Sequence, residues 1–138
     1  MTQAVAVITG GSHGLGRAMC LTFAQRGYRI VTTGLDPQGL AETSKQIQAL
    51  ESSCLTILCD HRQPASVANC IQTLRCEPQV DVLIHNAGHR QPADFLQSTP
   101  EQWQDHFAVN LMAPQQITQA ILPTMLARDG GQIIWIGS

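Results

Sequence analysis

Charged and aromatic residues are scarce in this sequence. Asp, Glu, Lys and Arg make up 13% of the 138 residues, and Phe, Trp and Tyr make up 4%. The formal net charge is −2 with histidine neutral, and the basic residues form no stripe. Nucleic acids and anionic lipids attract concentrated positive charge, so the composition argues against both as partners. The hydrophobic fraction of 43% is enough for one domain over residues 1–138 with a core of its own.

Long apolar runs and a secretion signal are also lacking. No run approaches the roughly 18 apolar residues that a membrane-spanning helix needs, so we expect no membrane partner. The N-terminus does not show the charged-then-apolar pattern of a signal peptide, which predicts a cytoplasmic protein. The five cysteines form no C-x-x-C pair and no metal-ligand spacing with a histidine. We therefore expect reduced packing residues and no metal site.

Apolar runs alternate with amphipathic stretches along the whole chain. The runs predict strands at residues 4–8, 28–33, 54–59, 80–85 and 132–136. The amphipathic stretches predict helices at residues 15–26, 37–51, 64–76 and 99–128. Strands that are apolar throughout are typical of a parallel sheet covered on both faces. We therefore expect an α/β fold with a doubly wound, Rossmann-type parallel sheet in the order 3-2-1-4-5, which ends after its fifth strand.

A glycine-rich turn joins the first predicted strand to the first helix. Its sequence is Thr9-Gly10-Gly11-Ser12-His13-Gly14-Leu15-Gly16. Glycine tolerates positive φ and has no Cβ, so the backbone of such a turn can approach a ligand closely. The free N–H groups of the first helical turn and the helix dipole favour an anion there. We expect this turn to bind phosphate and to lie beside the Asn86-Ala87-Gly88 turn at the carboxyl edge of the sheet.

Two general phosphate-binding motifs fit this turn poorly. A Walker A loop carries a lysine and then a serine or threonine after its last glycine, where this chain has Arg17 and Ala18. The dinucleotide fingerprint spaces its glycines G-x-G-x-x-G, whereas this turn spaces them G-x-x-x-G-x-G. The first motif is excluded, and the second fits only loosely.

An asparagine interrupts the apolar stripe of the longest predicted helix. The stripe is formed by Trp103, Phe107, Asn110, Pro114, Ile117 and Ile121. An amide on such a stripe is costly unless it is hydrogen-bonded, so Asn110 is either functional or satisfied structurally. Pro114 has no N–H to donate to the Asn110 carbonyl four residues earlier. We therefore expect a kink near Asn110 and a free carbonyl.

Together these motifs resemble those of the short-chain dehydrogenase/reductase family, whose turn reads T-G-x-x-x-G-x-G. Asp60, after the third strand, matches the aspartate that contacts the adenine in that family. His85-Asn86-Ala87-Gly88 matches the N-N-A-G motif, with a histidine in place of the first asparagine. Asn110 matches the asparagine of the catalytic tetrad. Residues 131–138 resemble the strand that ends in the catalytic serine, with Gly137 where a first serine is common. The resemblance covers essentially the whole chain.

The resemblance implies an NAD(P)-dependent oxidoreductase that transfers a hydride between a nicotinamide dinucleotide and a small alcohol or carbonyl substrate. It implies Asn110 and Ser138 as catalytic residues, with the asparagine anchoring a water that leads to a catalytic lysine. The expected cofactor-binding residues are Thr9, Gly10, Ser12, His13, Gly14, Leu15, Gly16, Asp36, Asp60, His61, Asn86, Ala87 and Gly88.

The choice between NAD and NADP depends on the end of the second strand. An acid about twenty residues past the glycine turn binds the ribose 2′-OH and favours NAD, and Asp36 has that spacing. Aligned to the family, the deciding position is instead Gly34, and Asp36 can then be only a helix N-cap. Leu35 and His13 occupy the sites where NADP users often carry a basic residue, and we expect Arg17 to point along its helix. We expect NAD, and NADP stays open.

The acid/base pair of the family is absent from the sequence. In the family a Y-x-x-x-K motif follows the strand with the catalytic serine, but the only tyrosine here is Tyr28 and the only lysine is Lys45. Hydride transfer to a carbonyl needs a proton donor for the forming alkoxide, which Asn110 and Ser138 cannot supply. We therefore expect the N-terminal part of a longer oxidoreductase, inactive on its own. The alternative is a short dinucleotide-binding module or pseudoenzyme without turnover.

Two surfaces of such a chain would lack a packing partner. Strand 132–136 would form an unprotected sheet edge, and helix 99–128 would be exposed along one side. Family members commonly form dimers or tetramers through that helix, so we expect a homo-oligomer or aggregation through residues 99–128.

Overall fold

The computed structural model describes residues 2–91 and 94–137. Its strands are β1 Val5–Thr9, β2 Arg29–Gly34, β3 Cys54–Leu58, β4 Val82–His85 and β5 Gln132–Trp135. Its α-helices are α1 Gly14–Gln25, α2 Pro37–Gln48, α3 Pro64–Arg75, α4 Pro100–Phe107 and α5 Ala113–Ala127. A 3₁₀ turn at Phe95–Gln97 precedes α4, and a π-helical turn at Ala108–Met112 joins α4 to α5. Within these ranges, no helix combines the length and apolarity needed to cross a membrane.

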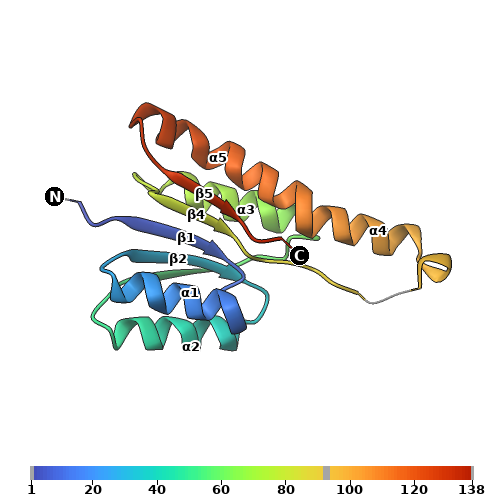
Figure 1. Cartoon of the computed structure of the whole chain (residues 1–138), viewed down its shortest axis with the longest axis horizontal. Coiled ribbons are helices and arrows are strands. Elements are labelled where there is room, and N and C mark those ends of the chain that lie inside the picture. Colours follow the sequence, from blue (N-terminus) through green and yellow to red (C-terminus); the bar gives the residue numbers. More distant parts are fainter. Residues whose placement is uncertain (1, 92–93, 138) are drawn as a thin grey trace.

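The strands run parallel in one sheet of order β3-β2-β1-β4-β5, which confirms the predicted order. Successive residues of the central strand β1 point to opposite faces. Ala6 and Ile8 belong to the core beneath α1 and α2, whereas Val5 and Val7 belong to the core beneath α3 and α5. Figure 1 shows these two helix layers on either side of the sheet. Because both faces are covered, every position from Val5 to Ile8 is buried and apolar.

β5 forms one edge of the sheet, where its ladder partner is β4. All of its residues are exposed, and Trp135 is 47% exposed. The exposed edge predicted for strand 132–136 is therefore confirmed for the part of the chain that the structure describes.

The helix predicted at residues 99–128 is interrupted. Thr99 caps α4 with its hydroxyl and Gln102 completes the capping box, as the T-P-E-Q sequence indicates. Beyond α4, the Ala113 N–H donates to the Ala108 carbonyl five residues earlier, which makes the turn π-helical. Pro114 directly follows and offers no N–H, so the regular hydrogen-bond ladder cannot pass this point. The predicted irregularity near Asn110 is therefore present.

The apolar stripe of residues 103–121 is buried only in its second half. Ile117 and Ile121 lie in the core, but Trp103 is 46% exposed and Phe107 is 53% exposed. Figure 1 shows the reason: α5 lies along the sheet, whereas α4 extends past the carboxyl edge. The exposure expected along helix 99–128 is therefore found on α4, although periodicity alone does not tell where the supporting sheet ends.

His85 occupies a buried position at the end of β4. Its Nε2 lies 2.7 Å from the Thr118 hydroxyl, and its ring stacks in a tilted arrangement on Trp135. Burial, and after it the nearby His61, lowers the pKa of His85 to about 4. The imidazole is therefore neutral in the folded chain at neutral pH.

We expect the free energy of unfolding to fall as the pH drops from about 6.5 to about 4. In this window the unfolded chain protonates His85 and the folded chain does not, so protons favour unfolding. The loss should be about 1–3 kcal/mol in urea titrations at several pH values. H85N, which places asparagine at this position, should flatten the slope, whereas H106N should keep it. An unchanged slope in H85N would contradict this origin.

Candidate dinucleotide site

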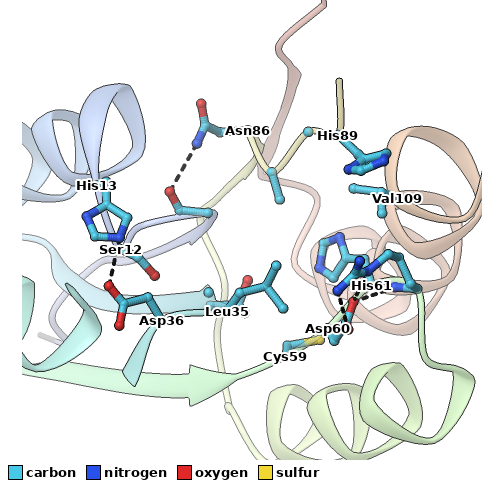
Figure 2. Close-up of a pocket in the computed structure, with 16 residues that line it drawn as sticks. Ser12, His13, Leu35, Asp36, Cys59, Asp60, His61, Asn86, His89 and Val109 are labelled. Carbon is cyan, nitrogen blue, oxygen red and sulfur yellow. Dashed lines mark hydrogen bonds and ion pairs between the residues drawn. The ribbon is translucent and has the colours of Figure 1, made fainter. Parts of the chain in front are cut away.

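A cavity of about 470 Å³ opens at the carboxyl edge of the sheet, where ligands bind in open α/β folds. The ends of β1, β2, β3 and β4 all contribute to its wall, as does the π-helical turn (Figure 2). It is lined by Gly10, Ser12, His13, Thr33, Gly34, Leu35, Asp36, Cys59, Asp60, His61, Arg62, Asn86, Ala87, Gly88, His89 and Val109. Nine of the thirteen expected cofactor-binding residues are among them, because Thr9, Gly14, Leu15 and Gly16 do not line the cavity.

In the glycine turn, no side chain caps the first-turn N–H groups of α1, and one buried hydroxyl has no partner. Gly10 and Gly14 have φ of +77° and +53°, which other residues rarely adopt. His13 is the N-cap of α1, and its side chain makes no capping hydrogen bond to the first-turn N–H groups. The Ser12 hydroxyl oxygen is buried and has no hydrogen-bond partner. Such a turn is suited to an anion, which would take up donors that the protein leaves free.

Thr9 and Asn86 join the two turns at the switch point of the sheet. The Thr9 hydroxyl accepts the backbone N–H groups of Asn86 and Ala87, each at 3.0 Å. The Asn86 amide donates to the Thr9 carbonyl at 3.0 Å and to the Gly10 carbonyl at 3.3 Å. Thr9 is fully buried behind the cavity wall. Thr9 therefore holds the two turns of the cavity wall together and is too buried to contact a ligand.

Gly16 supports the same turn by close packing. A Cβ at Gly16 would lie 1.9 Å from the Gly10 carbonyl oxygen, so only glycine lets α1 approach the end of β1 this closely. Leu15, by contrast, is exposed. Part of the T-G-x-x-x-G-x-G pattern thus serves packing.

His13 and Asp36 form an ion pair at one side of the cavity (Figure 2). The His13 Nε2 lies 2.9 Å from an Asp36 carboxylate oxygen. The Asp36 carboxylate also accepts the Gln38 N–H and so caps α2, as its place before Pro37 suggested. The Gly39 N–H, and after it the Gln38 N–H and the His13 ring, lower the pKa of Asp36. The Asp36 side chain is therefore negatively charged at neutral pH.

Arg17 does not point along its helix, as the sequence led us to expect. Its guanidinium crosses to α2, donates to the Thr43 hydroxyl at 2.9 Å and donates to the Ser12 carbonyl at 2.5 Å. A further hydrogen bond of 3.1 Å reaches the Gly39 carbonyl. Arg17 thus ties the back of the glycine turn to α2, and it does not line the cavity.

Asp60 and Arg62 form a second ion pair in the wall. The Arg62 guanidinium donates to both Asp60 carboxylate oxygens at 3.0 Å, and it lowers the pKa of Asp60. Sequence reasoning missed Arg62 as a cavity residue. The spacing D-x-R after a strand was the available signal.

Asn110 is held by the loop that follows the 86–88 turn. Its amide oxygen accepts the His89 N–H, and its amide nitrogen donates to the His89 carbonyl, both at 2.9 Å. The amide is therefore satisfied by backbone, and Asn110 itself is exposed and does not line the cavity. Ser138, the second expected catalytic residue, lies outside the described residues.

The residues that could form the family's tyrosine–lysine pair lie outside the cavity wall. Tyr28 packs edge-to-face on Phe23 at 5.1 Å, and Lys45 is exposed on α2, so neither lines the cavity. Within residues 2–91 and 94–137, no group of three His, Cys, Asp or Glu side chains is arranged to hold a metal ion.

A doubly wound parallel sheet with a glycine turn at its switch point defines a Rossmann-type protein. Comparison with known proteins narrows this class. The sequence model of the family described as short chain dehydrogenase matches residues 4–138. The chain belongs to this family.

Individual relatives are similar over nearly the whole chain. Oxidoreductase UcpA of Escherichia coli K12 is 30% identical, over 100% of this chain and 52% of that protein. The 3-oxoacyl-(acyl-carrier-protein) reductase FabG of Escherichia coli K12 is 30% identical, over 97% of this chain and 54% of that protein. A short-chain dehydrogenase from Sphingobium yanoikuyae, solved in complex with NADPH, has a TM-score of 0.93 at 28% identity, over 98% of this chain and 53% of that one. The chain thus spans about half the length of the curated relatives it matches.

We expect T9V to destabilise the fold by about 2 kcal/mol in urea unfolding, because valine keeps the shape but leaves two N–H groups at the switch point without their acceptor. T9S keeps the hydroxyl and should lose less than half as much. Equal losses in the two variants would assign the effect to packing rather than to the hydroxyl.

Proposed function

We propose that the cavity binds a nicotinamide dinucleotide. The observation that carries this proposal is the glycine turn with an uncapped helix N-terminus and a buried, unpartnered Ser12 hydroxyl in the wall of the cavity. The turn N–H groups and Ser12 would hold the phosphates. Asp36 would accept from a ribose hydroxyl, Asp60 with His61 would border the adenine, and the 86–88 turn would face the nicotinamide half. Several structural relatives were solved with NADP or NADPH, which supports the cofactor class.

We propose that the 138 residues are the cofactor-binding part of an oxidoreductase acting on an alcohol or carbonyl substrate. The dinucleotide would supply or accept the hydride. In this role Asn110 and Ser138 belong to the catalytic group, and a proton donor is required in addition. Tyr28 and Lys45 lie away from the cavity, so binding without turnover is the expected behaviour of these residues alone. The five free cysteines support a reducing compartment, the cytoplasm, as the location.

The Asp36 carboxylate supports NAD over NADP in this chain. A 2′-phosphate near Asp36 would bring two negative charges together, whereas a 2′-hydroxyl could donate to the carboxylate. His13 already occupies one side of this carboxylate. Some structural relatives were solved with NADP or NADPH, so a preference for NADP over NAD is the alternative to test.

Titration of NADH and NADPH, followed by nicotinamide fluorescence, tests both proposals. We expect saturable binding of NADH and weaker binding of NADPH. D36N keeps an N-capping side chain but removes the charge, so it should improve NADPH binding relative to NADH by roughly five- to tenfold. E42Q removes a carboxylate on the exposed face of α2 and should leave the ratio unchanged.

Two results would count against these proposals. Failure of NADH, NADPH and ADP-ribose to bind at millimolar concentration would reject the dinucleotide site. Tighter binding of NADPH than of NADH by the unaltered chain would reject the preference for NAD and leave the site standing.

We propose that the chain associates with itself through residues 99–128. Large apolar side chains are exposed here and on the preceding 3₁₀ turn, namely Phe95, Leu96, Trp103, Phe107, Leu111 and Met112. Exposed apolar patches of this kind favour association. Two of them, Phe95 and Trp103, line a further hollow of about 370 Å³ together with His106.

Light scattering at increasing concentration should show dimers or larger species. W103E combined with F107E should shift the chain to monomer, because charge at an apolar contact is costly to bury. L50E adds a charge at an exposed apolar residue outside this region and should leave association intact. A monomer at all concentrations in the unaltered chain would overturn the proposal.

A further inference from the structure

Cys59 lies in the wall of the cavity, directly after β3 (Figure 2). Its side chain is only 3% exposed, and its Sγ lies 3.8 Å from the Ser66 carbonyl oxygen on the first turn of α3. Cys70 follows Ser66 by four residues and therefore lies on the same face of α3. It is fully buried in the same core cluster as Cys59. The cavity wall thus contains one member of a pair of neighbouring thiols.

The surroundings of Cys59 favour its charged form. Hydrogen bonding to the neighbouring Cys70 thiol lowers the pKa of Cys59, although burial acts the other way. The same contact raises the pKa of Cys70. The N-terminus of α3, which has no capping side chain, adds the positive end of a helix dipole beside Ser66.

His61 supplies an independent sign that this part of the wall is built to face a ligand. The residue is 7% exposed and lines the cavity, yet neither ring nitrogen has a hydrogen-bond partner. Buried polar groups are normally paired, so an imidazole left free at a cavity wall is available to an incoming group. In Figure 2 the Cys59, Asp60 and His61 side chains lie across the cavity from the His13–Asp36 pair.

We propose that Cys59 is a covalent modification site that reacts with small electrophiles entering the cavity, that Cys70 is the positioning residue for its sulfur, and that modification and dinucleotide binding exclude each other. The last part rests on the proposed dinucleotide site. The first two parts concern the unliganded chain and stand without it.

The chemistry is a simple substitution when iodoacetamide is the probe. The Cys59 sulfur attacks the methylene carbon, a carbon–sulfur bond forms and the carbon–iodine bond breaks. Iodide leaves, and the thiol proton has passed to solvent. No oxidant or reductant is needed. The added group projects from the wall into the space that a dinucleotide would occupy.

The other cysteines provide references within the same molecule. Burial raises the pKa of Cys20 to about 11 and also raises the pKa of Cys54, so both should react slowly. Cys76 is exposed and reports the rate of an accessible thiol. All five positions can be followed together by peptide mass spectrometry.

Labelling rates of the 138-residue chain between pH 6 and pH 8 test the site. An ordinary thiol loses about tenfold in rate per pH unit in this range, because only the thiolate reacts. Cys59 should instead change less than about threefold and should exceed Cys20 and Cys54 by at least about tenfold. C70A removes the hydrogen-bond donor and should restore the steep pH profile at Cys59. C70S keeps a donor and should retain the flat profile.

A steep pH profile at Cys59 in the unaltered chain, or a rate no higher than that of Cys20, would overturn the modification site. A flat profile in folded C70A would overturn the positioning role of Cys70. Bound NADH should lower the labelling rate of Cys59 in proportion to the share of molecules that hold NADH. The labelling rate of Cys76 should stay unchanged. If fluorescence shows NADH bound and Cys59 still reacts at full rate, mutual exclusion is rejected. If no dinucleotide binds, the proposed function fails while the reactivity of Cys59 is still measured.

Discussion

The hydrogen bonds between the ends of β1 and β4 hold the candidate site together. One threonine hydroxyl accepts two backbone N–H groups of the 86–88 turn, and one asparagine amide donates to two carbonyls of the glycine turn. These contacts join segments that are distant in sequence but adjacent at the switch point of the sheet. The close approach at Gly16 then brings the N-terminus of α1 against the same place. These few contacts set the positions of the two turns that form this part of the cavity wall.

The charged side chains around the cavity contact one another, so the proposed phosphate binding would depend on uncharged donors. His13 faces Asp36, and Arg62 is bound by Asp60 on the other side. Arg17, the remaining cation of the turn, is engaged behind it by carbonyl oxygens and a hydroxyl. Backbone N–H groups, the helix dipole and Ser12 would therefore provide the attraction for an anion. In the proposed complex, the Asp36 carboxylate would influence the choice of ribose substituent.

Much of the fold was readable from the sequence because its strongest signals are local. Alternating apolar runs and helical stretches, with right-handed crossovers, predicted the sheet order correctly. The absence of an N–H in Pro114 predicted the irregularity at Asn110. The helix predicted to reach Glu51 ends at Gln48, since Glu51 adopts a left-handed turn that periodicity does not reveal. The exposure of α4 agrees with the expectation for helix 99–128, but the sequence did not indicate where the sheet stops beneath it.

The site was predicted less completely because its residues are brought together by tertiary contacts. From the sequence, Cys59 was interpreted as a packing residue, and only its contacts with α3 distinguish it from the other cysteines. Thr9 and Gly16 matched a binding motif, yet the structure places them behind the wall.

The most direct test of the central claim is a set of backbone amide chemical shifts, recorded while NAD is added to the chain. The account predicts the largest changes at residues 10–16, with further changes at Asp60 and Asn86. Changes confined to other surfaces, or none at saturating NAD, would contradict it.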